Sequence, residues 1–221
     1  MFPDDVPVLQ PALTTDSLPV HAARLAATDA GLAAILRQYG PPPLWAREAG
    51  FPTLVHLILE QQVSLASARA AFDRLVAAAN PLTPQAFLVL DDDQLLAIGF
   101  SRQKTRYARA LAEALLAGRL DLAALADLPD DAVDRQLTAL PGIGPWTASI
   151  YRLMVLLRPD AWPAHDIALA QSVAEMRGLA VRPSPEALAT IGDAWRPYRA
   201  VAARMLWHRY LSVRAERQTR P

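Results

Sequence analysis

The sequence predicts an all-α fold. Three observations support this class: apolar residues recur at intervals of three and four along most of the chain, the short apolar–polar alternation typical of strands is nearly absent, and prolines and glycines gather between the periodic stretches. Of the 221 residues, 52% are hydrophobic, which supplies a sizeable core and argues against a disordered chain.

The elements follow in order along the chain. Residues 1–15 hold Pro3, Pro7 and Pro11 without a clear period, so we expect a tail or an extended cover. The periodic stretches after them predict helices at about 17–28, 30–39, 50–63, 66–79, 83–89, 91–97, 102–117, 121–126, 130–139, 145–157, 165–176, 184–195 and 198–215.

Local start and stop signals support several of these helices. Capping or helix-initiating residues begin four of them: Thr83-Pro84, Ser101, Ser184-Pro185 and Pro197. Gly40-Pro41 and Gly118 are stop signals. Residues 41–43 and the run RPDAWPA at 158–164 are expected to be rigid connectors, and no repeat of solenoid period is present.

Composition excludes several classes of protein. The chain has no cysteine, so disulfides, thiolate zinc sites and cysteine-ligated iron–sulfur clusters are not available to it. It has no apolar run of membrane-spanning length and no signal-peptide pattern at its start, so we expect a cytoplasmic protein without a membrane partner, associated with the nucleoid if bacterial. The net charge is zero, and Lys104 is the single lysine beside 21 arginines.

Residues 140–148, LPGIGPWTA, interrupt the helical pattern with two prolines and two glycines. A helix is expected to end at Leu140 and the next to begin at Pro145, the favoured first position of a helix. Glycine accepts positive φ, so the residues between them would form a tight hairpin with amide groups at a helix N-terminus, which suits an anion such as phosphate. The local pattern alone also fits a plain helix–helix turn.

LPGIGPWTA closely resembles the helix–hairpin–helix of the base-excision DNA glycosylase superfamily. Asp166 lies 22 residues after Gly144, at the spacing of that superfamily's catalytic aspartate, and the surrounding WPAHDIAL (162–169) and the earlier LILEQQVSLASA (57–68) are similar to further superfamily segments. The runs GFSRQKTRYARALA (99–112) and WRPYRAVAARMLW (195–207) resemble the 3-methyladenine DNA glycosylase II branch in particular. The resemblance extends from about residue 48 to residue 210.

This resemblance implies a single-module form of the family fold, with two helical subdomains and a cleft between them. Residues 48–157 would form the central subdomain with the helix–hairpin–helix. Residues 16–47 and 158–221 would form the second subdomain, which carries Asp166.

Asp166 has two readings. An aspartate at a helix start, shortly after Pro163, caps the helix and complements its dipole. The resemblance instead implies a catalytic carboxylate, which would stabilise positive charge on the sugar as the N-glycosidic bond breaks and would orient or deprotonate water. The two readings are compatible.

Trp146 decides the expected mechanism. Superfamily members that also nick the strand carry a lysine at this position, whose amine forms a Schiff base. Here the position holds tryptophan, and Lys104 lies in another helix, so water is the expected nucleophile. The sequence therefore predicts a monofunctional glycosylase without lyase activity, with no required cofactor and no iron–sulfur cluster.

The resemblance also implies a substrate pocket. Trp146 matches a pocket tryptophan of the branch, and its ring would stack on a cationic methylated purine. Ile150, where relatives carry an aromatic, and His165, where they carry a small or acidic residue, depart from the family pattern. Further pocket candidates, each of which could equally be packing or a hydrogen-bonding neighbour, are Tyr151, His165, Tyr198 and Trp207.

The remaining site candidates would hold DNA. Gln62 is placed at the wedge position, where a side chain fills the gap left by a flipped base; its alternative reading is a glutamine at a helix end. The hairpin grip would comprise Gly142, Ile143 and Gly144. Ser101, Arg102 and Lys104 either form a second phosphate grip or an ordinary capped helix start. Relatives hold a monovalent cation, Na⁺ or K⁺, on hairpin carbonyls that match Thr138, Leu140 and Ile143.

The sequence thus predicts a monomeric enzyme of base excision repair that removes alkylated purines, such as 3-methyladenine and 7-methylguanine, from double-stranded DNA. One alternative is a non-catalytic helix–hairpin–helix module that binds DNA or recognises damage, since such units also serve purely as phosphate grips. Another is an enzyme for oxidised purines, against which the missing lysine argues.

Overall fold

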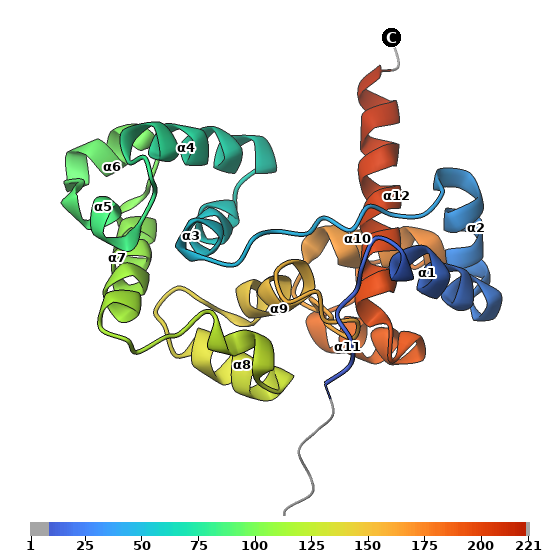
Figure 1. Ribbon diagram of the computed structural model, residues 1–221. Coiled ribbons are helices and arrows are strands. Elements are labelled where there is room, and N and C mark those ends of the chain that lie inside the picture. Colours follow the sequence, from blue (N-terminus) through green and yellow to red (C-terminus); the bar gives the residue numbers. More distant parts are fainter. Residues whose placement is uncertain (1–8, 220–221) are drawn as a thin grey trace, which may run out of the picture. The chain divides into compact units, whose positions relative to one another are not determined.

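The computed structural model describes residues 9–219. Within this range it contains α-helices and two short 3₁₀ helices but no strand, so the predicted all-α class is confirmed (Figure 1). The helices form two compact units. The hairpin unit is Arg47–Tyr151, and the Asp166 unit comprises the described residues up to Ala46 and those from Arg152 onward. The second junction lies inside a helix, whereas the family resemblance implied a junction after residue 157.

The hairpin unit is built around one almost entirely buried helix. Its helices are α3 (Phe51–Glu60), α4 (Leu65–Ala78), α5 (Pro84–Val89), α6 (Asp92–Ile98), α7 (Arg102–Leu116), α8 (Asp130–Thr138) and the start of α9 (Pro145–Met154). Helix α3 packs against α4 and α7, and seven of its ten residues are buried. The ring of Phe87 in α5 lies 5.7 Å from the rings of both Phe51 and Phe100, which extends the apolar core away from α3.

The Asp166 unit is organised around the long C-terminal helix. Helix α12 (Arg199–Thr219) contacts α1 (Ser17–Thr28), α2 (Ala30–Tyr39) and α10 (Ile167–Arg177), and α11 (Pro185–Gly192) leads into a 3₁₀ turn at Asp193–Trp195. Arg204 fixes α12 in place. Its guanidinium is completely buried and donates to the carbonyls of Leu44, Ala200 and Leu153 at 2.7–3.1 Å. Burial lowers the pKa of Arg204 to about 10.

Several helix ends differ from the sequence prediction. Helix α3 ends at Glu60 rather than 63 because Gln62 takes a left-handed conformation with φ 58°. Helix α9 ends at Met154 rather than 157, and Leu157 has φ 53°. The stretch predicted at 121–126 forms only a 3₁₀ helix at Ala124–Asp127, the segment 184–195 divides into α11 and the 3₁₀ turn, and α12 continues to Thr219.

The predicted N-terminal tail is partly packed. Residues 1–8 lie outside the described range, but Leu13 is buried and its amide donates to the Leu157 carbonyl at 2.8 Å. Within the described part of the chain, no helix has both the length and the apolar character needed to cross a bilayer.

Candidate active site and nucleic-acid interface

Asp166 caps helix α10. One oxygen of its carboxylate, Oδ1, accepts the Leu169 amide at 2.7 Å and the Trp207 indole Nε1–H at 3.0 Å. The side chain is half-buried. A carboxylate with two donors on one oxygen has a fixed direction, and the helix N-terminus favours its negative charge. The capping role is therefore present, and it supplies the rigidity that a catalytic role requires.

Trp207 reaches Asp166 from the middle of α12. Its side chain is 8% exposed, and its ring lies edge-on to that of Trp45, with centroids 6.5 Å apart. Trp45 belongs to the connector between α2 and α3 and has φ 49°, a conformation that is uncommon for a bulky residue and is concentrated at functional sites. The sequence reasoning missed Trp45, whose only signal was an aromatic residue two positions after three prolines.

The other two pocket candidates of this unit have different surroundings. His165 is exposed in the turn directly before Asp166. Tyr198 stacks on His21 of α1, with ring centroids 4.0 Å apart, which gives it a packing contact. Of the predicted pocket residues in this unit, only Trp207 contacts the carboxylate through an identified hydrogen bond.

The hairpin lies between α8 and α9 in the other unit. Gly142 has φ 84°, and a Cβ atom there would overlap the ring of Tyr107, so this position requires glycine. The expectation of positive φ is wrong for Gly144, where a Cβ atom would meet nothing within 4 Å. Glycine at 144 therefore leaves open space beside the backbone.

The three hairpin amides differ in whether they already donate a hydrogen bond. The Ile143 amide donates to the Leu140 carbonyl at 3.1 Å, and Ile143 is buried. Its N–H group is therefore engaged within the hairpin and is not available for the predicted contact with phosphate. Among the described residues, no acceptor is found for the amides of Gly142 and Gly144. These two amides are the ones suited to bind an anion.

Trp146 and Tyr151 lie on α9 in contrasting environments. Trp146 is half-exposed in the first turn of the helix. Tyr151 is completely buried, and its hydroxyl has no hydrogen-bond partner among the described residues. Burial raises the pKa of Tyr151 to about 12. The tyrosine is thus neutral at physiological pH, and its burial favours packing over the predicted contact with a substrate.

Gln62 lies in the short loop that follows the C-terminal end of α3, here called the wedge loop (residues 61–64). Its side chain is exposed, and its left-handed backbone turns the chain sharply after α3. The preceding Gln61 ties this loop to the hairpin: its Nε2 donates to the Gly142 carbonyl at 2.8 Å and to the Thr147 hydroxyl at 3.0 Å. The candidate wedge and the candidate phosphate grip are therefore joined by one side chain.

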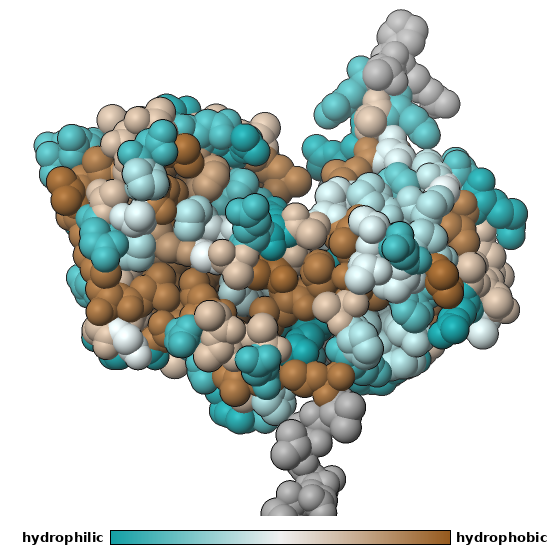
Figure 2. All heavy atoms as spheres, in the orientation of Figure 1, coloured by the Kyte–Doolittle hydropathy of each residue, from teal (hydrophilic) through white to brown (hydrophobic). Residues whose placement is uncertain are grey.

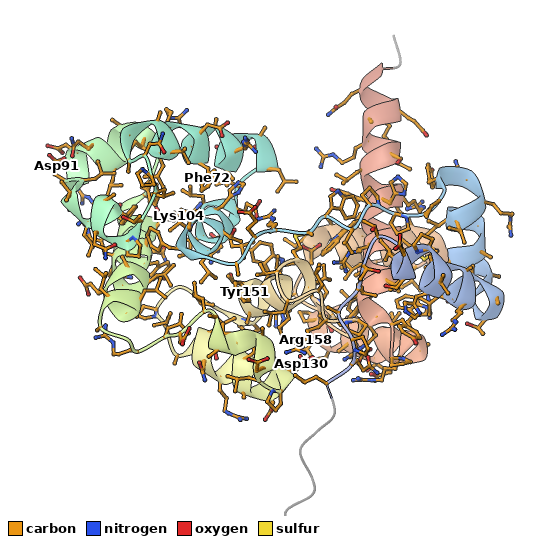
Figure 3. All side chains as sticks on the ribbon, in the orientation of Figure 1. Phe72, Asp91, Lys104, Asp130, Tyr151 and Arg158 are labelled. Carbon is orange, nitrogen blue, oxygen red and sulfur yellow. The ribbon has the colours of Figure 1, made fainter. Side chains whose placement is uncertain are left out.

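Lys104 has a role that the sequence did not indicate. Its ammonium donates to the carbonyl of Leu59 at 2.7 Å, at the C-terminal end of α3, where a cation complements the helix dipole (Figure 3). Burial lowers the pKa of Lys104. Ser101 caps α7 by accepting the Lys104 amide at 3.2 Å, and Arg102 is exposed. The capped helix start predicted at Ser101 is therefore present, whereas the Lys104 ammonium, predicted as part of a second phosphate grip, binds the C-terminal end of α3.

An ion pair completes the support of α3. Glu60 is buried, and its two oxygens accept from Arg47 at 2.8 and 3.1 Å. His56, one turn earlier, stacks on Phe72 of α4 at 4.4 Å, and its pKa is lowered, mainly by burial. Glu60, the residue directly before the wedge loop, is therefore held in place through both of its carboxylate oxygens. Nothing in the sequence pattern distinguished Glu60 from an ordinary helix residue.

Each unit thus gathers one part of the predicted site. The Asp166 unit holds Asp166, Trp207 and Trp45, while the hairpin unit holds the hairpin, Gln62, Lys104 and Trp146. The described residues contain no group of three or more histidine, aspartate or glutamate side chains suited to a metal ion.

Comparisons with known proteins show which proteins share this fold. A DNA-3-methyladenine glycosidase from Bacillus halodurans is 30% identical in sequence and superposes over 94% of this chain and 95% of its own, with a TM-score of 0.75. The 3-methyladenine DNA glycosylase Mag1 of Schizosaccharomyces pombe, solved with abasic DNA, is 24% identical and has the same fold, with a TM-score of 0.78 over 86% of this chain and 95% of its own. The Bacillus subtilis protein YfjP is 26% identical over 80% of this chain, which spans 64% of YfjP.

The family assignment follows from a separate match. Residues 55–197 fit the family model described as HhH-GPD superfamily base excision DNA repair protein. This range contains the wedge loop, the hairpin and Asp166. The chain belongs to the HhH-GPD superfamily of base excision DNA repair proteins.

Proposed function

We propose that this protein is a monofunctional DNA glycosylase that hydrolyses the N-glycosidic bond of alkylated purines in duplex DNA. The observation that carries the proposal is the Asp166 carboxylate, fixed at the start of α10 by Leu169 and Trp207 in a chain of this superfamily. The similarity to proteins named as 3-methyladenine glycosylases supports the choice of substrate.

Asp166 would act on the deoxyribose. As the bond between base and sugar lengthens, positive charge develops on the sugar, and a carboxylate held in a fixed direction stabilises it without reorganising. The same group would orient the attacking water or take its proton. Cleavage gives the free base and an intact strand with an abasic site, and the water supplies the hydroxyl group on the sugar.

We propose that no lyase step occurs, because no lysine amine is found at the position where it would form a Schiff base. Trp146 occupies the position after the hairpin at which a lysine would form a Schiff base. The ammonium of Lys104 is occupied at the carbonyl of Leu59 in a different part of the hairpin unit. Water is therefore the nucleophile in the proposed mechanism.

The hairpin unit would bind and distort the duplex. The amides of Gly142 and Gly144 would hold a phosphate, and Gln62 would fill the space left by the flipped nucleotide. Gln61 supports this division of roles because it connects the wedge loop to the hairpin through Gly142 and Thr147.

The aromatic side chains favour cationic bases. Trp146 is half-exposed, so its ring can stack on a base, and a methylated purine that carries positive charge adds a cation–π contribution. Such a base already has a weakened glycosidic bond and leaves without a strong general acid. We therefore propose 3-methyladenine and 7-methylguanine as substrates ahead of neutral oxidised bases.

We also propose that the hairpin carbonyls hold a monovalent cation. Among the described residues, no hydrogen bond is donated to the carbonyl oxygens of Thr138 and Ile143, and the Leu140 carbonyl accepts only the Ile143 amide. Neutral oxygen ligands suit Na⁺ or K⁺. A cation held there would reinforce the positive potential that the hairpin presents to a phosphate.

One experiment tests the proposed function. Duplex DNA treated with a methylating agent is incubated with the protein, and released bases are identified by mass spectrometry. We expect 3-methyladenine and 7-methylguanine. Binding to DNA without release of any base would instead favour the non-catalytic module, and release of 8-oxoguanine alone would favour an enzyme for oxidised purines.

A further inference from the structure

A groove of about 420 Å³ runs between α10 and α12 of the Asp166 unit. We call it the α10/α12 groove and define its walls by two helical stripes. Ile167 and Glu175, eight residues apart, lie on the α10 wall, and Tyr210, Arg214 and Arg217 lie on the α12 wall. Gln171 of α10, Gln218 of α12 and Arg182, which lies just beyond α10, also line the groove. Figure 2 shows hydrophilic side chains along the C-terminal part of α12.

The groove has a net positive charge, because Arg182, Arg214 and Arg217 line it together with one carboxylate, Glu175. Glu175 accepts from Gln171 at 2.9 Å and from Arg209 at 2.8 Å, and these contacts, with a smaller contribution from the nearby charge of Arg217, lower the pKa of Glu175. In the described range, no carboxylate forms an ion pair with Arg182, Arg214 or Arg217. All three arginines are exposed, and Arg214 is oriented by the Tyr210 hydroxyl, to which it donates at 3.0 Å.

The groove begins beside the candidate catalytic residue. Ile167 directly follows Asp166 and is 68% exposed. At 1.5 Å per residue, the α10 wall from Ile167 to Glu175 is about 12 Å long. The rise along the duplex axis is about 3.4 Å per nucleotide of one strand, so a wall of this length spans between three and four nucleotide steps of a duplex whose axis runs parallel to it.

We propose that the α10/α12 groove binds the sugar–phosphate backbone of the lesion-bearing strand on one side of the flipped nucleotide. The inference rests on the proposed function, because Asp166 can act only if the backbone of that nucleotide passes the start of α10. The strand is covalently continuous, so its neighbouring phosphates must leave along a surface close to Asp166. The groove is one such surface, because its α10 wall begins at Ile167, and guanidinium groups match phosphate oxygens in a fork.

Salt dependence of binding provides the first test. The double variant Arg214→Ala/Arg217→Ala is compared with the wild type on a duplex containing an abasic-site analogue. The matched control is Arg24→Ala/Arg37→Ala, which removes two exposed helical arginines of the same unit outside the groove. If both groove arginines contact phosphates, the slope of log K against log salt becomes shallower by about 1.8 in the groove variant alone. The ratio of wild-type to variant affinity then falls about 12-fold between 50 and 200 mM salt.

Cysteine chemistry provides the second test, because the chain has no cysteine of its own. The Gln218→Cys variant places a thiol on the groove wall, and Val89→Cys, at a position that is 82% exposed in the hairpin unit, is the control. We expect the abasic duplex to slow thiol modification at position 218 and to leave the rate at position 89 unchanged. Poly-glutamate is run in parallel as an acidic protein-like competitor.

The outcomes separate the two proposals. A groove variant with the wild-type salt slope, in a protein that binds DNA and releases methylated bases, overturns the groove assignment and leaves the proposed function intact. Protection of position 218 by poly-glutamate but not by DNA also overturns it and assigns the groove to an acidic protein. A wild-type protein that neither binds duplex DNA nor releases a base overturns both.

Discussion

Trp207→Phe removes one donor from the candidate catalytic carboxylate and keeps an aromatic ring. The indole Nε1–H donates to Asp166 Oδ1 at 3.0 Å, and the Leu169 amide is the other donor on that oxygen. A hydrogen bond to a charged group contributes about 1.5–3 kcal/mol. If the whole of this contribution orients Asp166 in the transition state, excision slows by about 10- to 150-fold. The assay is the single-turnover release of 7-methylguanine from methylated duplex DNA.

The chain contains a matched control for this change. Trp195 donates its Nε1–H to Asp29 Oδ2, also at 3.0 Å, and Asp29 is the N-cap of α2 in the same way that Asp166 is the N-cap of α10. Trp195→Phe therefore breaks the same kind of bond at a helix start that has no proposed chemistry. We expect it to lower the melting temperature while the excision rate per folded molecule stays at the wild-type value.

Two results would refute this reasoning. If Trp207→Phe excises within about two-fold of the wild type, the indole does not orient Asp166 for the reaction. If Trp195→Phe slows excision as much as Trp207→Phe does, the effect comes from general loosening of the Asp166 unit. Melting curves for both variants report how much folded protein is present in each assay.

Three further predictions concern the hairpin unit. Gly142→Ala should lower the melting temperature, because the added Cβ atom overlaps the ring of Tyr107. Gly144→Val should melt like the wild type but bind damaged and undamaged duplexes more weakly, and to the same degree. If Gly144→Val lost affinity for damaged DNA alone, the phosphate role of the hairpin would be contradicted. Lys104→Met should slow excision while leaving the salt slope of DNA binding unchanged, since the ammonium supports α3; a slope shallower by about 0.9 would show a phosphate contact instead. Borohydride should trap no covalent complex with DNA containing a lesion, and a trapped adduct would contradict the assignment of Trp146 to the lysine position.

Local signals predicted the helices well where the determinants are local. The segments 17–28 and 30–39 coincide with α1 and α2, and Asp29 between them caps α2 by accepting the Leu32 amide. The helix beginning after Ser101 was also confirmed, since the serine hydroxyl accepts the Lys104 amide. Apolar periodicity and capping residues act within a few positions, so they can be read from the sequence directly.

The wedge loop and Lys104 were harder to predict because their partners are distant along the chain. Gln61 contacts Thr147, 86 residues away, and Lys104 contacts Leu59, 45 residues away. Neither contact leaves a periodic signal. A flexible lysine near a helix start is typical of a phosphate grip, and only the fold reveals that its amine reaches the end of another helix.

The site around Asp166 was predicted in part. The spacing from Gly144 singled out Asp166 as the candidate carboxylate, which stays a prediction, and its expected capping role is confirmed. Trp207 was one of several aromatic candidates, and its bond to Asp166, across 41 residues, distinguishes it from Tyr198, which stacks on α1. Trp45 could not be identified from the sequence, because its left-handed backbone conformation has no sequence signature in a tryptophan.

Asp166→Asn tests the central claim most directly. Asparagine caps helices about as well as aspartate and its carbonyl oxygen can accept from Leu169 and Trp207, so the variant removes the charge and preserves the fold. Losing one electrostatic stabiliser typically raises the activation free energy by about 2.7–4 kcal/mol. We therefore expect the single-turnover release of 7-methylguanine to slow by at least about 100- to 1,000-fold, while binding to abasic-analogue DNA is retained. Excision at a rate close to that of the wild type would contradict the assignment of Asp166 as the catalytic carboxylate.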